Sequence, residues 1–125
     1  MPCRGIRGAT TVETDSAAAI LEATHRLLAQ IVEANGVDVA DIASAFFTVT
    51  ADLRAAFPAQ AARSLGWHHV ALLDAQEIPV PGSLPRCVRV LVHWNTSRPQ
   101  DEIRHIYLDE AAQLRVDIPQ PEIEE

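Results

Sequence analysis

The sequence lacks several residue types and patterns, and most of these shortages narrow the range of functions. It contains no lysine, an absence that excludes little by itself. Its formal net charge of −7 argues against nucleic-acid binding, which requires a basic surface. No run approaches 18 apolar residues, and the first residues, MPCRGIRG, lack the apolar core of a signal peptide. We therefore expect neither membrane insertion nor export. The two cysteines, Cys3 and Cys87, both lie in strand-like segments, where we expect them to be reduced and buried.

Motifs for common cofactors and catalytic groups are also missing. The chain has no G-x-G-x-x-G and no phosphate loop, which argues against a nucleotide site. His68 and His69 are adjacent and would point to opposite sides of a strand, so we expect no shared metal. Ser83 lies in the turn-like sequence PGSLPR, outside any G-x-S-x-G motif. We assign no role to His25 or His93. Hydrolytic or redox chemistry would need groups that this pattern does not supply.

The residues that are present predict one α+β domain built on a mixed sheet with one long helix on one face. The chain is 125 residues long and 48% hydrophobic, enough for a single core. Asp15 or Ser16 can cap the long helix, and Asn35-Gly36 ends it. The short segments are strands at Cys3–Thr11, 45–50, 70–75, 86–94 and 104–108, a helical turn at 39–43, and a short helix from Pro58 to Leu65. We expect residues 1–118 to form the domain and the acidic residues 119–125 to form a mobile tail. A sheet with only one covered face predicts that a second subunit covers the other face.

Two strand-like segments each carry an arginine where an apolar residue is usual. In the 86–94 segment, Val88 and the valines and tryptophan that alternate after it form one apolar face, so Arg89 must project from the other. Arg7 alternates with Gly5 and Ala9, whose small side chains would leave room for a ligand. A guanidinium on a rigid strand pairs with two carboxylate oxygens at once, which favours a carboxylate ligand.

Other polar residues have the strand parity to join this arrangement, although each also has a plain structural explanation. Tyr107 lies between two apolar residues and therefore on their opposite face, and Glu77 follows the alternation of the third strand. Taken singly, Tyr107 could be a half-buried sheet tyrosine and Glu77 a loop carboxylate, while Arg63 and Arg115 could be surface arginines. Composition and periodicity therefore indicate an anion-binding domain and no particular reaction.

Four separated motifs carry a more specific signal. They are RGIRGATTVE, TADLRAAFPAQAAR, the QE pair followed by PVPGSLPRCVRVL, and PQDEIRHIYLDEAAQLR. The chain resembles the AroH-class chorismate mutases in the residue types and the order of these motifs, over about residues 3–118. This resemblance implies a homotrimer with a pseudo-α/β-barrel core and active sites at subunit interfaces. It also implies a cytosolic enzyme that converts chorismate to prephenate, towards phenylalanine and tyrosine, without cofactor or metal.

The resemblance also implies roles for individual residues. Arg7 would hold a substrate carboxylate, Arg89 would reach the ether oxygen and a carboxylate, and Glu77 would accept a hydrogen bond from the ring hydroxyl. Tyr107 would donate to a carboxylate. The remaining residues implied to line the pocket or its rim are Phe57, Ala59, Gln60, Arg63, Leu72, Leu73, Asp74, Leu114 and Arg115.

Two positions depart from the family pattern. Asp74 stands where a cysteine or small residue can occur, so it could share the substrate hydroxyl or crowd Glu77. Gln60 stands where a lysine can occur, which removes one positive charge from the mouth of the site.

Two alternatives remain open from the residues themselves. One is a trimeric binding module that captures carboxylate metabolites, and the other is an imine-hydrolysing trimer with an interfacial arginine and glutamate. Either would explain Arg89, but neither explains the contexts of Arg7, Glu77 and Tyr107 together.

Overall fold

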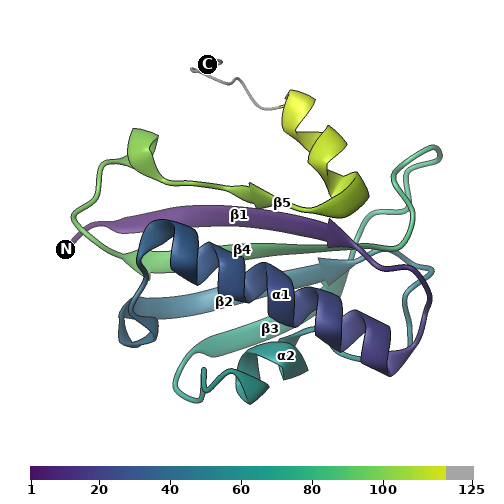
Figure 1. Cartoon of the computed structure of the whole chain (residues 1–125), viewed down its shortest axis with the longest axis horizontal. Coiled ribbons are helices and arrows are strands. Elements are labelled where there is room, and N and C mark those ends of the chain that lie inside the picture. Colours follow the sequence, from purple (N-terminus) through teal and green to yellow (C-terminus); the bar gives the residue numbers. More distant parts are fainter. Residues whose placement is uncertain (118–125) are drawn as a thin grey trace.

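Five strands form one mixed β-sheet in the computed structural model, which describes residues 1–117, with side chains described up to Leu114 (Figure 1). The strand order is β3-β2-β4-β1-β5; β1 and β2 each pair antiparallel with β4, whereas the β2–β3 and β1–β5 pairs are parallel. The elements are β1 (Cys3–Thr11), α1 (Ala17–Asn35), β2 (Ile42–Val49), α2 (Ala59–Ser64), β3 (Ala71–Gln76), β4 (Cys87–Asn95) and β5 (Ile106–Tyr107), with 3₁₀ helices η1 (Val39–Asp41), η2 (Gln100–Glu102) and η3 (Asp109–Asp117).

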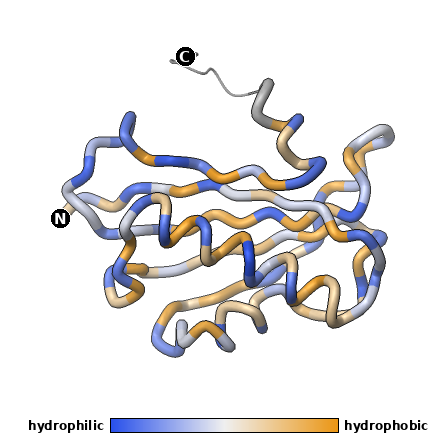
Figure 2. The backbone as a smooth tube through the Cα atoms, viewed as in Figure 1, coloured by the Kyte–Doolittle hydropathy of each residue, from blue (hydrophilic) through white to orange (hydrophobic). Residues whose placement is uncertain are grey.

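Helix α1 crosses one face of the sheet, with α2 beside it on the same face (Figure 1). Hydrophilic residues interrupt the hydrophobic ones at intervals along α1 (Figure 2). The apolar stripe packs on the inward side chains of β1, β2 and β4, and the fully buried members of this core include Ile6, Leu27, Leu28, Ile31, Phe47 and Val92. Burial of this stripe supplies most of the free energy that holds α1 to the sheet, since apolar area removed from water contributes about 25 cal/mol per Å².

The predicted ends of α1 are confirmed. Ser16 is the N-cap, and its Oγ accepts from the backbone N–H of Ala19 at 3.1 Å. Asp15 instead accepts from the backbone N–H groups of Arg54 and Ala55. Gly36 follows the helix with φ of 67°, a left-handed conformation that glycine adopts without a Cβ clash.

Three expectations about local structure require correction, and one element was not predicted. Strand β2 begins at Ile42, three residues earlier than expected, because the predicted helical turn is only the single turn η1. Asp38 caps its start, and the backbone N–H of Ile42 closes its end on the Val39 carbonyl. The last strand has only two residues, since β5 pairs only with β1. Segment 109–117 is a 3₁₀ helix that the sequence analysis did not predict. Cys87 is buried as expected, but Cys3 is exposed because it lies at the start of β1; both cysteines are free.

The face of the sheet opposite α1 is the open face, which carries Arg7, Phe46, Leu73 and Arg89. Val88, Val90, Val92 and Trp94 are all buried on the α1 side, which confirms that Arg89 projects from the other side. Phe46 and Leu73 remain 48% and 56% exposed, although both are large apolar residues in strands. Exposed apolar residues of this kind, gathered on one sheet face, are typical of an interaction surface.

Among residues 1–117, no helix has the length and apolar character needed to cross a membrane. The expected tail at 119–125 and the domain boundary at residue 118 lie outside the described residues.

Candidate active site

The strand register brings four side chains into one row across the open face. Thr48 of β2 pairs with Arg89 of β4, Arg89 pairs with Ala9 of β1, and Ala9 pairs with Tyr107 of β5. Directly paired residues on neighbouring strands point to the same face. The row therefore runs from Thr48 to Tyr107 with Arg89 near its centre. We call it the polar row.

Glu77 joins the polar row at its β2 end. Its Oε2 accepts from Thr48 Oγ1 at 2.5 Å and lies 3.3 Å from Arg89 Nε. Its backbone N–H donates to the Val49 carbonyl, which continues the β2–β3 pairing by one residue. The ion pair uses only the Nε donor of a guanidinium that has five N–H groups, so the four donors on its terminal nitrogens are not used by this pair. Arg89 is thereby oriented and still able to bind an anion.

Arg7 lies on the same face as Arg89, one diagonal step away. It pairs with Leu91, and diagonal neighbours of this kind have Cα atoms roughly 7–8 Å apart. Its backbone N–H donates to Nδ1 of His105 at 2.9 Å, which links β1 to the segment that leads into β5. Burial and the nearby Arg7 lower the pKa of His105 below its usual 6.5, which favours the neutral imidazole that this hydrogen bond requires.

The space beside Arg7 is narrower than the sequence suggested. Ala9 was expected to leave room for a ligand, but it is buried with Cys87 beneath Ala111 of η3. Tyr107 and Leu114 are partly buried against the same cluster. The 3₁₀ helix η3 therefore covers the end of the open face near Tyr107, and the free part of the polar row extends from Arg89 towards Glu77.

A second set of predicted residues lies at α2, on the other side of the sheet. Phe57 precedes the helix and is 69% exposed, and Gln60 and Arg63 are exposed on the helix itself. Ala59 is buried in the main core, and its backbone N–H donates to Asp74 Oδ1 at 3.0 Å. Asp74 therefore interacts with the start of α2 and not with Glu77, because neighbouring positions of β3 alternate between faces. We call these residues the α2 group.

Burial raises the pKa of Asp74 above its usual 3.8. The Ala59 hydrogen bond and the charge of Arg63 lower the pKa, but their effects are smaller than that of burial. A raised pKa in the folded state means that this carboxyl stabilises the fold most below 3.8, and the contribution is lost as the pH rises through the folded pKa. At neutral pH, Asp74→Asn should therefore unfold with a free energy within about 0.5 kcal/mol of wild type, since Asn can still accept from Ala59. Asp74→Ala should cost about 1 kcal/mol, because the hydrogen bond to the Ala59 backbone N–H is lost.

Denaturant unfolding of the two Asp74 variants at one protein concentration checks this prediction. A larger loss for the asparagine variant than for the alanine variant would contradict it.

The remaining predicted positions divide between the two faces. Leu73 lies on the open face beside Phe46, whereas Leu72 is partly buried against the core on the α2 side. The side chain of Arg115 lies outside the described residues. The single chain thus brings together Arg7, Glu77, Arg89 and Tyr107, and it holds the α2 group separately.

Nucleophilic and metal-based chemistry find little support among the described residues. Burial raises the pKa of the Cys87 thiol, although nearby Arg89 opposes this effect, so the thiolate is disfavoured at neutral pH. No group of three or more potential metal ligands occurs within residues 1–117. The arrangement can bind and orient an anion and stabilise negative charge.

Sequence reasoning did not identify Thr48 or His105. Thr48 has the parity of Phe46 in the sequence FFTVT, which places it on the open face, and this signal was available. The contact of His105 with the Arg7 backbone joins residues 98 positions apart, and no local pattern reports it.

Comparisons with known proteins agree on one family. The family "Chorismate mutase type I" matches residues 3–118. The chain is 58% identical over 116 residues to chorismate mutase AroH of Thermus thermophilus, covering 92% of this chain and 95% of that protein. It is 45% identical over 119 residues to chorismate mutase AroH of Bacillus subtilis, covering 94% of each. Among solved structures, a chorismate mutase from Clostridium thermocellum matches with a TM-score of 0.86 at 50% identity, covering 87% of this chain and 97% of that one.

Proposed function

This chain belongs to the chorismate mutase type I family, and we propose that its polar row performs the rearrangement of chorismate to prephenate. The observation that carries this assignment is the line of Glu77, Arg89 and Tyr107 across one face, with Arg7 a diagonal step away. We further propose that residues 1–118 form a single chorismate mutase domain.

The reaction explains why the site needs neither a nucleophile nor an acid–base pair. Chorismate is a dianion that folds back on itself; its ether carbon–oxygen bond breaks while a new carbon–carbon bond forms within the same molecule. All atoms and electrons are retained, and no proton is transferred. The protein therefore has two tasks, which are to hold the reactive conformer and to stabilise the charge that develops.

Arg89 performs the second task. As the ether bond lengthens, negative charge grows on its oxygen, and a fixed guanidinium stabilises that charge more in the transition state than in the ground state. Glu77 holds Arg89 through Nε, and Thr48 in turn holds Glu77, so little reorganisation is needed during the reaction.

Arg7 and Tyr107 perform the first task by binding the substrate carboxylates. Their strands are neighbours, and His105 accepts the backbone N–H of Arg7 immediately before β5. Glu77 has a second oxygen, Oε1, that is not used by the Arg89 and Thr48 contacts and is available to the substrate hydroxyl. Two fixed carboxylate anchors select the folded conformer and reduce the entropic barrier.

We propose that the active unit is a homotrimer in which the open faces turn inward to form a pseudo-barrel. Support comes from the exposure of Phe46 and Leu73 on that face and of Phe57 beside α2. Because the polar row and the α2 group lie on different faces of one chain, both can meet the same substrate only if they come from neighbouring subunits. Each site would then combine the polar row of one subunit with Phe57, Gln60 and Arg63 of the next.

The test of function uses the purified chain with chorismate alone. Loss of the absorbance of chorismate together with the appearance of prephenate is the expected result. Binding of chorismate without turnover would favour a carboxylate-binding module, and turnover of an imine in place of chorismate would favour the hydrolytic alternative.

Turnover should vary little between about pH 6 and 9, because arginine stays charged throughout and no proton is transferred. The lowered pKa of His105 is consistent with this expectation, since its imidazole remains neutral over most of that range. The same shift makes the folded state less stable as the pH falls below 6.5, where the unfolded chain binds a proton that the folded chain resists. Initial rates at saturating chorismate check the prediction, and a bell-shaped profile centred near neutrality would contradict it.

A further inference from the structure

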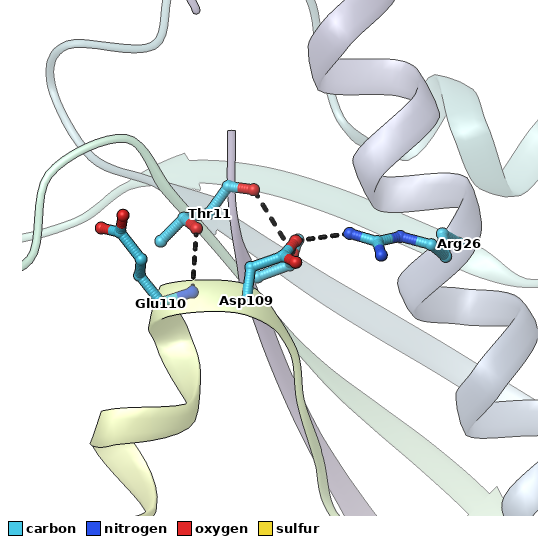
Figure 3. Close-up of polar contacts among 5 residues, drawn as sticks. Thr11, Arg26, Asp109 and Glu110 are labelled. Atoms are coloured by element: carbon cyan, nitrogen blue, oxygen red, sulfur yellow. Dashed lines mark hydrogen bonds and ion pairs between the residues drawn. The ribbon is translucent and has the colours of Figure 1, made fainter. Parts of the chain in front are cut away.

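Between Tyr107 and Ala111, one side chain reaches from the open face to the α1 side of the sheet. Tyr107 and Ala111 both contact the cluster on the open face. Between them, the side chain of Asp109 turns to the α1 side, where Oδ2 accepts from Thr10 Oγ1 at 3.1 Å and forms an ion pair with Arg26 of α1 (Figure 3). The start of η3 is therefore held from the α1 side of the sheet, whereas η3 covers the candidate site on the open face.

The backbone at Asp109 has an uncommon conformation. Asp109 has φ of 54°, in the left-handed region that few non-glycine residues adopt, although Asp and Asn tolerate it better than others. The next residue is also fixed, since the backbone N–H of Glu110 donates to Thr11 Oγ1 at 3.3 Å (Figure 3). Residues in such conformations persist when surrounding contacts hold them there. The contacts of Asp109 and Glu110 thus set the direction in which η3 leaves β5.

A cavity of about 680 Å³ lies between α1 and η3 at this point, and its lining includes Ala19, Glu22 and Ala23 of α1 and both Asp109 and Glu110 of η3. The Arg26 side chain extends along this cavity to Asp109 and connects its two sides. We use the name latch for Thr10, Arg26 and Asp109.

We propose that the latch is a positioning device for catalysis, which holds η3 so that Leu114 covers the Tyr107 end of the polar row. Arg26 and Asp109 do not touch the substrate; they act through the direction of η3. The side chains of the ion pair are 49% and 42% exposed, and pairs with such exposure contribute little to folding stability. Loss of the pair should therefore change substrate binding more than stability. This inference rests on the proposed function of the polar row.

The kinetic test compares Arg26→Gln, Asp109→Asn and the double variant with wild type on chorismate. Asparagine retains tolerance for the left-handed backbone, so the second change removes the charge and keeps the turn. Each single variant should raise KM by about three- to fivefold, a factor that corresponds to at most about 1 kcal/mol. Turnover at saturation should stay within about twofold, since Arg89 is unaffected. The double variant should be no worse than either single variant, because both remove one interaction.

Two further variants serve as controls. Arg26→Lys retains the charge and should restore most of the affinity. Glu22→Gln removes a negative charge from the same cavity, as Asp109→Asn does, but leaves the latch intact, so its KM should match wild type. The melting temperature should change by no more than a few degrees in all of these variants.

A second measurement does not depend on activity. Amide hydrogen exchange of Glu110 and Ala111 in the substrate-free enzyme should become faster in Arg26→Gln than in wild type. Unchanged exchange would overturn the latch, and faster exchange with an unchanged KM would overturn its role in positioning. A raised KM that is accompanied by a melting temperature lowered by more than a few degrees would show a structural role only. If the wild-type chain fails to convert chorismate, the proposed function fails, while the exchange comparison still decides whether the latch holds η3.

Discussion

Replacement of Arg89 with alanine should lower the turnover of chorismate by at least a hundred- to a thousandfold. Loss of one preorganised donor at a developing oxyanion costs roughly 2.7–4 kcal/mol, and loss of a full charge should cost at least as much. Arg89→Lys should recover only part of the activity, because an ammonium cannot keep the Nε contact to Glu77 and also present a planar pair of donors to the substrate. The measurement is kcat and KM of folded, assembled protein.

Arg63→Ala is the matched control for Arg89, because it removes the same charge from the α2 group. It should raise KM with little effect on kcat, as expected for a residue at the rim. The fold should survive both changes, since Arg89 projects from the face opposite the buried valines of β4. If Arg89→Ala retains more than about a tenth of wild-type turnover, Arg89 is only an anchor and the electrostatic mechanism is wrong.

Leu73→Glu should dissociate the proposed homotrimer and abolish most activity at micromolar concentration. Leu73 is 56% exposed in the single chain, on the face that the trimer is proposed to bury. A buried charge without a partner costs about 3–5 kcal/mol, so association should weaken by more than a hundredfold. Light scattering should give a mass near three times 13.6 kDa for wild type and a lower mass for the variant.

The control for this experiment introduces the same carboxylate on the outer side of α1. Ala29 is exposed there, so Ala29→Glu should remain trimeric and active. Full activity of a clean monomer, whether wild type or Leu73→Glu, would contradict both the trimer and the shared site. Activity of Leu73→Glu that returns at higher protein concentration would support them, because assembly depends on concentration.

Local patterns in the sequence predicted much of this architecture correctly. The alternation from Val88 to Trp94 indicated both a strand and the side from which Arg89 projects, because neighbouring residues of a strand point to opposite faces. Ser16 and Gly36 gave the ends of α1, since a helix terminus needs specific partners for its free backbone groups. The same alternation predicted that Tyr107 and Ile106 point to opposite faces of the sheet. The packing confirms this, since the two side chains contact different hydrophobic clusters.

Parity could not give the register between strands. That Arg89 pairs with Ala9, and Ala9 with Tyr107, depends on which residues of three distant segments align, and the tertiary structure alone decides it. Expectations for Asp74 show the same limit. The comparison with the family pattern left two roles open, sharing the substrate hydroxyl or crowding Glu77. In the single chain Asp74 does not contact Glu77 and instead accepts from the Ala59 backbone N–H, because β3 has one face toward α2.

The sequence by itself determined which residue types this protein has for its chemistry and, through periodicity and caps, which side of each element they occupy. These properties follow from interactions within a few positions along the chain. The tertiary structure decided which of those residues meet, from the polar row to the contact of Arg26 with Asp109 across 83 positions. Such contacts depend on how the whole sheet and α1 bury their apolar faces together, and no short segment contains that information.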